Sequence, residues 1–347
     1  MTLLTSPRRI ILGLMTIGPP GLTGTRITTL EEFNSCLDLF QKSGYSEIDT
    51  ARLYADTQQE VFTRQAKWQE RGLLAATKWF PWQAGAHSPH RLTEALNKSL
   101  QELGTDSVEV FYLHAPDRSV PFADTFGTLD QLYRDGKFKK LGLSNFSAFE
   151  VAEVVIMCCE RGWVRPTVYQ AVYNVFARTI EAELIPCCQR YGIDVVVFNP
   201  LAGGLLSGKY KPCDTNASQN PKEGRFSDTF GFQGKVYRDR YFKPSMFSAL
   251  EMLQPLVGKY GLSMAEVALR WCIHHSALQI TRGTRRDGVI VGFSSIDQLT
   301  SNLADLEKGP LPDELVAALD RAWTMVKADS SDFWFGNLKY EYSFGSL

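Results

Sequence analysis

The sequence predicts a closed parallel (β/α)8 TIM barrel that forms a single domain over residues 1–347. Short apolar segments, which predict strands, alternate with longer segments of helical periodicity. There are eight segments of each kind. The apolar segments are hydrophobic nearly throughout, which is typical of parallel strands covered on both faces. A doubly wound sheet is the alternative, but no G-x-G-x-x-G motif follows the first apolar segment.

The predicted strands are rich in aliphatic and aromatic residues, as strands buried on both faces require. They lie at residues 10–14, 45–50, 73–78, 108–114, 140–143, 167–171, 194–198 and 288–293.

The intervening helices are predicted from apolar side chains that recur every three or four positions. Residues 28–42 show this spacing, and Gly44 follows as a stop. Residues 88–103 begin with Ser-Pro, and Gly104 follows them. Further helices are predicted at 150–162, 181–192, 245–260, 263–276, 295–306 and 312–327.

Two segments do not fit the strand–helix alternation. About ninety residues separate the seventh and eighth predicted strands, where a βαβ unit has about 30. Within this stretch, residues 200–244 are predicted to form a long ordered loop that takes part in cofactor or substrate binding. Residues 328–347 form an aromatic C-terminal tail.

The composition excludes several classes of partner. The net charge of −1 argues against nucleic acid or anionic membranes as partners. Seven cysteines are scattered without a C-x-x-C motif, which favours reduced thiols in a cytoplasmic protein, and no metal site is predicted. The apolar run 10–17 is too short for a signal or anchor and is interrupted by Gly and Pro at 18–21.

Four polar side chains stand at or just after the ends of predicted strands: Asp49, Tyr54, Lys78 and His114. The carboxyl ends of barrel strands meet at one face, so these side chains are expected to converge. A phenol can protonate a carbonyl oxygen if a neighbouring ammonium stabilises the phenolate. A carboxylate can hold that ammonium, and a neutral imidazole can orient the carbonyl. Reduction also needs a hydride donor.

The motifs around these residues, I-D-T-A-x-x-Y, A-T-K and Y-L-H, resemble the aldo-keto reductase superfamily, and the likeness covers essentially the whole chain. Strings such as FYLHAPD, GLSNF, NPLAGGLL and ALRW are similar to the branch that contains aflatoxin-aldehyde and succinic-semialdehyde reductases. The resemblance implies that Tyr54 is the general acid, that Lys78 lowers its pKa, that Asp49 pairs with Lys78, and that His114 orients the carbonyl.

The resemblance also implies NADPH as cofactor. Ser144 and Asn145 end one predicted strand and Gln170 ends the next. Their hydroxyl and amide groups would hold the nicotinamide carboxamide, and the alternative is that they only cap the strand ends. Phe198 would stack on the nicotinamide or belong to the barrel core. A Gly-rich turn and the start of the helix at 295–306 favour phosphate groups. The implied cofactor-binding residues are Ser144, Asn145, Gln170, Phe198, Asn199, Pro200, Leu201, Gly203, Lys209, Arg225, Ser294, Gln298 and Asn302. NADH stays an alternative, because 2′-phosphate recognition rests on few charges.

The substrate is expected to be an aldehyde or ketone bound among aromatic side chains. The predicted substrate residues are Trp79, Tyr173, Arg238 and Arg240. One of the two arginines is expected to bind a substrate carboxylate. The tail differs from that of the relatives, so short dicarboxylic semialdehydes are not favoured. A larger, aromatic substrate is an alternative, with Trp334 and Phe335 either lining the pocket mouth or packing on the barrel surface.

A redox-sensing regulatory subunit is the second class of function that the sequence allows. Potassium-channel β subunits share the barrel and the four catalytic side chains, and a redox-sensing regulatory subunit of this kind would bind NADPH with little turnover. The longer strings match the reductase branch better. The resemblance further implies a homodimer, although the sequence shows no interface.

Overall fold

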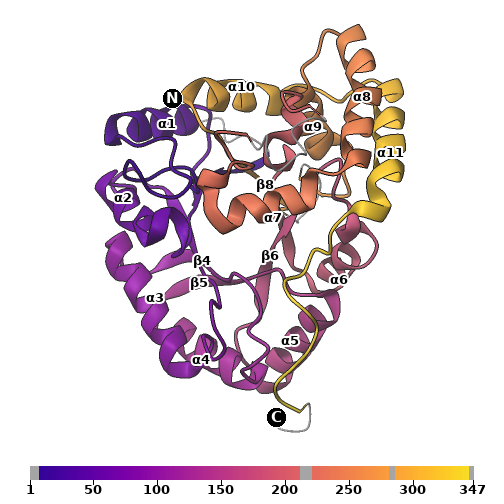
Figure 1. The fold of residues 1–347 in the computed structure, drawn as a ribbon. Helices are drawn as coiled ribbons and strands as arrows, with labels where there is room; N and C mark the ends of the chain where they lie inside the picture. Colours follow the sequence, from indigo (N-terminus) through magenta and orange to yellow (C-terminus); the bar gives the residue numbers. More distant parts are fainter. Residues whose placement is uncertain (1–7, 212–220, 281–285, 344–347) are drawn as a thin grey trace.

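The computed structural model describes residues 8–211, 221–280 and 286–343, and it confirms the predicted (β/α)8 barrel (Figure 1). Eight parallel strands close in sequential order, with β8 hydrogen-bonded to β1. The strands are β1 (Arg9–Gly13), β2 (Glu47–Asp49), β3 (Leu74–Trp79), β4 (Val108–Leu113), β5 (Phe138–Ser144), β6 (Pro166–Val172), β7 (Asp194–Phe198) and β8 (Gly288–Val291).

The helices surround the barrel, and most lie where the periodicity predicts them (Figure 1). They are α1 (Leu30–Lys42), α2 (Gln59–Gln65), α3 (Pro89–Leu103), α4 (Phe122–Arg134), α5 (Ala148–Arg161), α6 (Leu184–Tyr191), α7 (Gly231–Tyr241), α8 (Pro244–Lys259), α9 (Met264–His274), α10 (Ile296–Leu306) and α11 (Asp313–Val326). Three of them, α2, α4 and α7, were not predicted, and α7 is described below with the segment 200–244. Helix α2 is short and buries polar side chains, whereas α4 buries Phe122, Phe126 and Leu129 at regular helical spacing.

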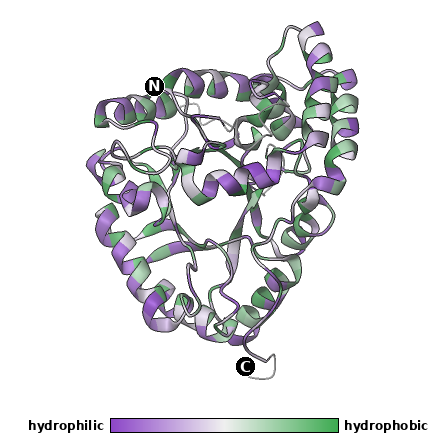
Figure 2. Cartoon of the chain, viewed as in Figure 1, coloured by the Kyte–Doolittle hydropathy of each residue, from purple (hydrophilic) through white to green (hydrophobic). Residues whose placement is uncertain are grey.

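The core has two parts, which follow from the alternation of side chains along each strand. One set fills the barrel interior, and the other lies between the strands and the helices. Both sets come from the same strands; in β1, for example, Ile11 points inward while Leu12 packs against the helices. Inside the barrel, Gly142 leaves room for Tyr112, because a Cβ atom at Gly142 would lie 2.2 Å from the Tyr112 ring. Hydrophobic and hydrophilic stretches lie side by side on the surrounding helices (Figure 2).

The segment 200–244 is not simply a loop. A short 3-10 helix covers Ala202–Ser207, and residues 231–241 form α7, which lies across the mouth of the barrel (Figure 1). Residues 212–220 lie outside the described part of the chain. Helix α7 carries few apolar side chains and buries only Gly234 and Tyr241, so its sequence lacks the hydrophobic periodicity on which the helix predictions rested.

After α11 the described part of the tail, up to residue 343, runs along the edge of the barrel past α6 toward α5 (yellow in Figure 1). No helix in the described ranges is long and apolar enough to cross a membrane. All six cysteines in these ranges are free thiols, and four of them are buried; Cys213 lies outside the description.

Candidate active site

The four predicted catalytic side chains meet at the carboxyl ends of the strands. Lys78, on β3, donates from Nζ to Asp49 Oδ2 at 2.6 Å and to the Tyr54 hydroxyl oxygen at 3.2 Å. A third hydrogen bond, to the carbonyl oxygen of Thr50 at 2.7 Å, fixes the ammonium. The lysine is fully buried and Asp49 is 4% exposed, so the ion pair is shielded from solvent. In this geometry the charge of Lys78 acts directly on the Tyr54 hydroxyl and favours its ionised form.

Burial and charge set the protonation states of the pair. Burial alone would lower the pKa of Lys78, but Asp49 and Tyr54 outweigh it, and the pKa is raised. Burial raises the pKa of Tyr54 above its usual value, while Lys78 acts in the opposite direction. The lysine therefore has the sign of effect that the sequence predicts, although burial is larger. Lys78 stays charged and Tyr54 carries its proton at neutral pH.

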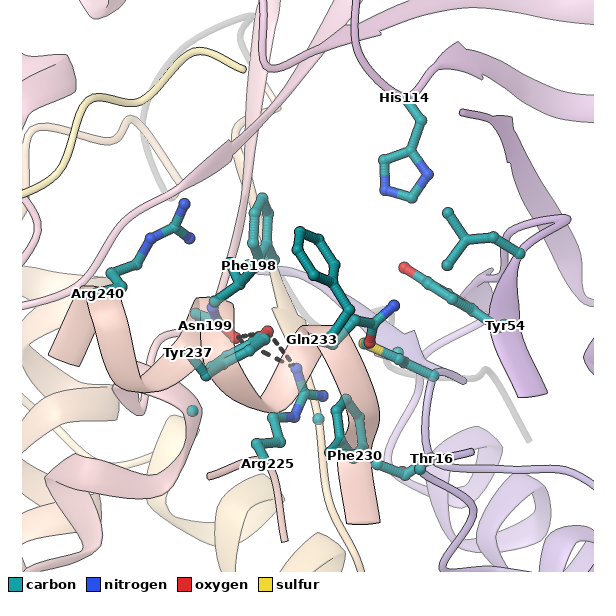
Figure 3. Close-up of a pocket in the computed structure, with 18 of the residues that line it drawn as sticks. Thr16, Tyr54, His114, Phe198, Asn199, Arg225, Phe230, Gln233, Tyr237 and Arg240 are labelled. Atoms are coloured by element: carbon teal, nitrogen blue, oxygen red, sulfur yellow. Dashed lines mark hydrogen bonds between the residues drawn. The ribbon is translucent and has the colours of Figure 1, made fainter. Parts of the chain in front are cut away.

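His114 follows β4 and faces the same space as Tyr54 (Figure 3). Its ring lies edge-on to the Tyr54 ring, with centroids 6.3 Å apart. Burial, followed by the charge of Lys78, holds the pKa of His114 well below its usual value, so the imidazole is neutral. Its Nδ1 is buried and has no hydrogen-bond partner within the described ranges. A neutral ring can donate to a substrate oxygen from one nitrogen.

The turn after Tyr54 has a strained backbone. Three consecutive non-glycine residues, 55–57, have positive φ angles of 46°, 49° and 72°. Each such conformation costs on the order of 1 kcal/mol and persists only where surrounding contacts impose it. Two such contacts are a hydrogen bond from Thr23 N to Asp56 Oδ2 at 2.9 Å and one from Arg52 to the Thr57 carbonyl at 2.9 Å. These contacts fix the conformation of the turn that follows Tyr54.

A cavity of about 1310 Å³ opens above these side chains. Asp49, Tyr54 and His114 line it, whereas Lys78 lies beneath. All of the predicted cofactor residues line the cavity except one. The exception is Ser144, which is fully buried and accepts a hydrogen bond from Asn145 Nδ2 at 3.1 Å.

The amide side chains expected at the nicotinamide also form hydrogen bonds with two of the four predicted catalytic residues, His114 and Asp49. Asn145 Nδ2 donates to the carbonyl oxygen of His114 at 2.7 Å, and Asn145 itself has a φ of 60°. Gln170 Nε2 donates to Asp49 Oδ1 at 2.9 Å. The second carboxylate oxygen of Asp49 is thereby satisfied, so Gln170 orients the ion pair as well as lining the cavity.

A second group of polar side chains lies further along the cavity. Arg225 donates to the Tyr237 hydroxyl oxygen at 2.6 Å, and that hydroxyl donates to Asn199 Oδ1 at 3.1 Å (Figure 3). Arg225 also reaches the end of β8, because a Cβ atom on Gly292 would lie 3.4 Å from its Nη2. The nearby Gln298 already accepts hydrogen bonds from the backbone N–H and the hydroxyl of Ser294. The cation therefore stands beside the start of α10.

Three of the four predicted substrate residues are placed elsewhere. Trp79 and Tyr173 do not line the cavity. Trp79 on β3 and Tyr173 directly after β6 each stand an odd number of positions from a residue of the barrel interior, Ala76 and Val168 respectively, and therefore point toward the helices. Trp79 donates to the carbonyl of Ala86, and Tyr173 donates to Glu181. Arg238 forms an ion pair with Asp228 outside the cavity. Of the four, only Arg240 lines it.

Several cavity-lining side chains were missed because α7 was predicted as loop. Gln233, Val236 and Tyr237 line the cavity beside Arg240, which was predicted. Their spacing of three, four and seven residues places them on one face of a helix. The spacing is visible in the sequence and could have indicated this face, but α7 has no apolar periodicity to mark it as helical.

A phenol, an ammonium, a carboxylate and a neutral imidazole at the mouth of a parallel barrel are suited to protonating and orienting a carbonyl oxygen, which is chemistry that an oxidoreductase acting on carbonyl groups needs. The chain belongs to the aldo/keto reductase family, whose model matches residues 9–324. The resemblance stated from the sequence is thus confirmed.

Individual relatives cover most of the chain. An aldo-keto reductase of Pseudocercospora fijiensis is 41% identical over 304 residues, which cover 86% of this chain and 99% of the relative. Aflatoxin B1 aldehyde reductase member 2 of Mus musculus is 42% identical over 85% of this chain and 81% of its own length. The aldo-keto reductase pigE of Monascus ruber is 37% identical over 92% and 95%, respectively.

Proposed function

We propose that the protein reduces an aldehyde or ketone to an alcohol with NADPH, and that Tyr54 is the general acid. The observation that carries this proposal is the placement of the Lys78 ammonium between Asp49 and Tyr54, in a buried position. The nicotinamide, when bound, supplies the hydride that forms the new C–H bond.

The side chains of the protein donate the proton and orient the carbonyl. The Tyr54 hydroxyl gives its proton to the carbonyl oxygen as negative charge develops there. Lys78 stabilises the phenolate that remains, and Asp49 holds the ammonium in position. His114, being neutral, donates a hydrogen bond that orients the carbonyl.

The cavity fits a dinucleotide with phosphate groups. Lys209 and Arg225 line it, and neither forms an ion pair with any described residue. Asn199 Nδ2 is buried there without a described partner. Unpaired cations and an unused donor suit phosphate oxygens. Arg225 would therefore hold the adenosine 2′-phosphate that distinguishes NADPH from NADH.

Replacing Arg225 with Gln is expected to weaken NADPH binding by about 10- to 100-fold, the usual range for losing a hydrogen bond to a charged group. Binding of NADH, which lacks the 2′-phosphate, should change much less. Fluorescence titration of both cofactors measures the ratio. Lys235→Gln, on the exposed side of α7, is the control. Equal weakening of both cofactors would contradict the assignment of Arg225 to the 2′-phosphate.

Arg240 is proposed to bind an acidic or polyoxygenated group of the substrate. It is the predicted arginine that lines the cavity, and it has no ion-pair partner in the described ranges. Arg240→Leu should raise KM for carboxylated aldehydes by about 10-fold, as expected for one charge-assisted hydrogen bond, and leave neutral aldehydes unchanged. Steady-state kinetics with matched aldehydes, beside Lys235→Leu, decides this. An equal effect on both substrates would refute the role.

The cytoplasmic location and the homodimer stay predictions from the sequence. Free, mostly buried thiols are consistent with a reducing compartment.

A further inference from the structure

The C-terminal tail lies outside the region that the family model matches, which ends at residue 324. In the structure this tail reaches the catalytic face. Phe335 N donates to the carbonyl oxygen of Asn145 at 2.9 Å. The Phe335 ring packs edge-on against Phe80, with centroids 5.1 Å apart, and Phe80 packs in the same way against His114 at 5.6 Å. The tail, which the family model does not cover, therefore contacts Phe80, and Phe80 in turn contacts His114.

A buried ion pair fixes the tail in this position. Arg118 donates through Nε and Nη2 to the two carboxylate oxygens of Glu150, at 2.7 and 3.0 Å. Its remaining nitrogen, Nη1, donates to the carbonyl oxygen of Phe335 at 2.6 Å. Tyr340 donates to Glu150 at 2.7 Å, and Glu341 N donates to the carbonyl oxygen of Arg118 at 2.9 Å. The tail is thus tied down on both sides of residues 336–339.

Glu150 is held independently of the tail, which makes the anchor rigid. It accepts hydrogen bonds from the backbone and the hydroxyl of Ser147 and so caps the start of α5. Glu150 is fully buried and Arg118 is 8% exposed. Each of the three guanidinium nitrogens of Arg118 donates one hydrogen bond, and the charge of the guanidinium is already paired with the carboxylate of Glu150. The role of Arg118 is to position the tail.

The tail leaves aromatic surface open in the cavity. Phe80, Trp82 and Phe335 all line the cavity, and the Phe80 and Trp82 centroids are 4.9 Å apart. Trp82 is 62% exposed and Phe335 is 44% exposed. Large exposed rings gathered beside a catalytic group mark a ligand-binding surface rather than core packing. Aromatic surfaces of this kind favour flat π systems, which stack on them or meet them edge to face.

We propose that Phe80, Trp82 and Phe335 form a subsite for a planar aromatic or conjugated group attached to the reacting carbonyl, and that Arg118 and Tyr340 are positioning residues for it. The proposal rests on the proposed reductase function. It makes the choice of substrate depend partly on Phe335, which lies outside the residues that the family model matches.

The first test compares Phe335→Ala with wild type on 2-naphthaldehyde and on propanal. Loss of one aromatic contact should lower kcat/KM for 2-naphthaldehyde by about 3- to 10-fold and leave propanal within about 2-fold. Phe335 is exposed, so the variant should melt at the wild-type temperature. Equal losses on both aldehydes, or no loss on either, would overturn the subsite.

Binding of the corresponding alcohol, 2-naphthylmethanol, separates the subsite from the reaction. Calorimetric titration in the presence of NADP⁺ should show weaker binding to Phe335→Ala than to wild type by the same factor. If neither aldehyde is turned over, the reductase function fails while this titration still decides the subsite. If propanal is reduced but 2-naphthylmethanol binds both proteins equally, the subsite fails alone.

Tyr340→Phe tests the positioning role, because it removes the bond to Glu150 and retains the ring. It should reproduce the selective loss on 2-naphthaldehyde, and the double variant with Phe335→Ala should lose no more than Phe335→Ala alone. Tyr260→Phe, which removes an exposed hydroxyl bonded to Glu314, is the control. Additive losses in the double variant would show that Tyr340 does not act through Phe335.

Discussion

Tyr54→Phe should lower kcat by about 10²- to 10⁴-fold, the usual contribution of a positioned general acid, without weakening NADPH binding. The substitution removes one oxygen atom, and the hydrogen bond recorded for that oxygen is with Lys78 Nζ. The phenyl ring keeps its buried position beside His114. The fold and the cavity are therefore retained, while the proton for the carbonyl oxygen is lost.

The measurement is NADPH consumption with an electron-poor aromatic aldehyde, together with a fluorescence titration of NADPH. Tyr133→Phe, at a partly exposed surface position, is the control. Full activity in Tyr54→Phe would remove this residue from the mechanism. Tight NADPH binding with no turnover in either protein would instead favour the redox-sensing subunit as the function.

Lys78→Met is expected to abolish measurable turnover and also to destabilise the fold. Without the ammonium, the buried carboxylate of Asp49 keeps only the hydrogen bond from Gln170 among those recorded for it. Removing one partner of a buried ion pair costs about 3–5 kcal/mol of unfolding free energy, because the remaining charge is left uncompensated. Urea denaturation of wild type and variant measures this difference, and the NADPH assay measures the loss of turnover.

A second variant separates stability from catalysis. Asp49→Asn combined with Lys78→Met removes both charges, and replacing a buried pair by neutral groups is often close to neutral for stability. The double variant should regain most of the unfolding free energy and none of the activity. If Lys78→Met is as stable as wild type, the pair is not shielded from solvent in the way the structure indicates.

Much of the catalytic group could be predicted because it depends on local features. Strand ends can be located from apolar segments, and parallel strands in a barrel bring those ends to one face. This is why Asp49, Lys78 and His114 converge as expected. The pKa of Tyr54 was less predictable, since its burial depends on the packing of the whole mouth and outweighs the single neighbouring charge.

The sequence by itself determined the barrel and the family, and it indicated the four polar side chains, because these follow from periodicity and from short motifs. Only the tertiary structure decided which side chains line the cavity beyond them. Trp79 and Tyr173 were misplaced because position near a strand end does not give the direction of the side chain, which alternates along the strand. The anchor of Arg118 on Phe335 joins residues 217 positions apart. No local pattern encodes such a contact, since it depends on where two distant segments are brought together by the packing of the barrel.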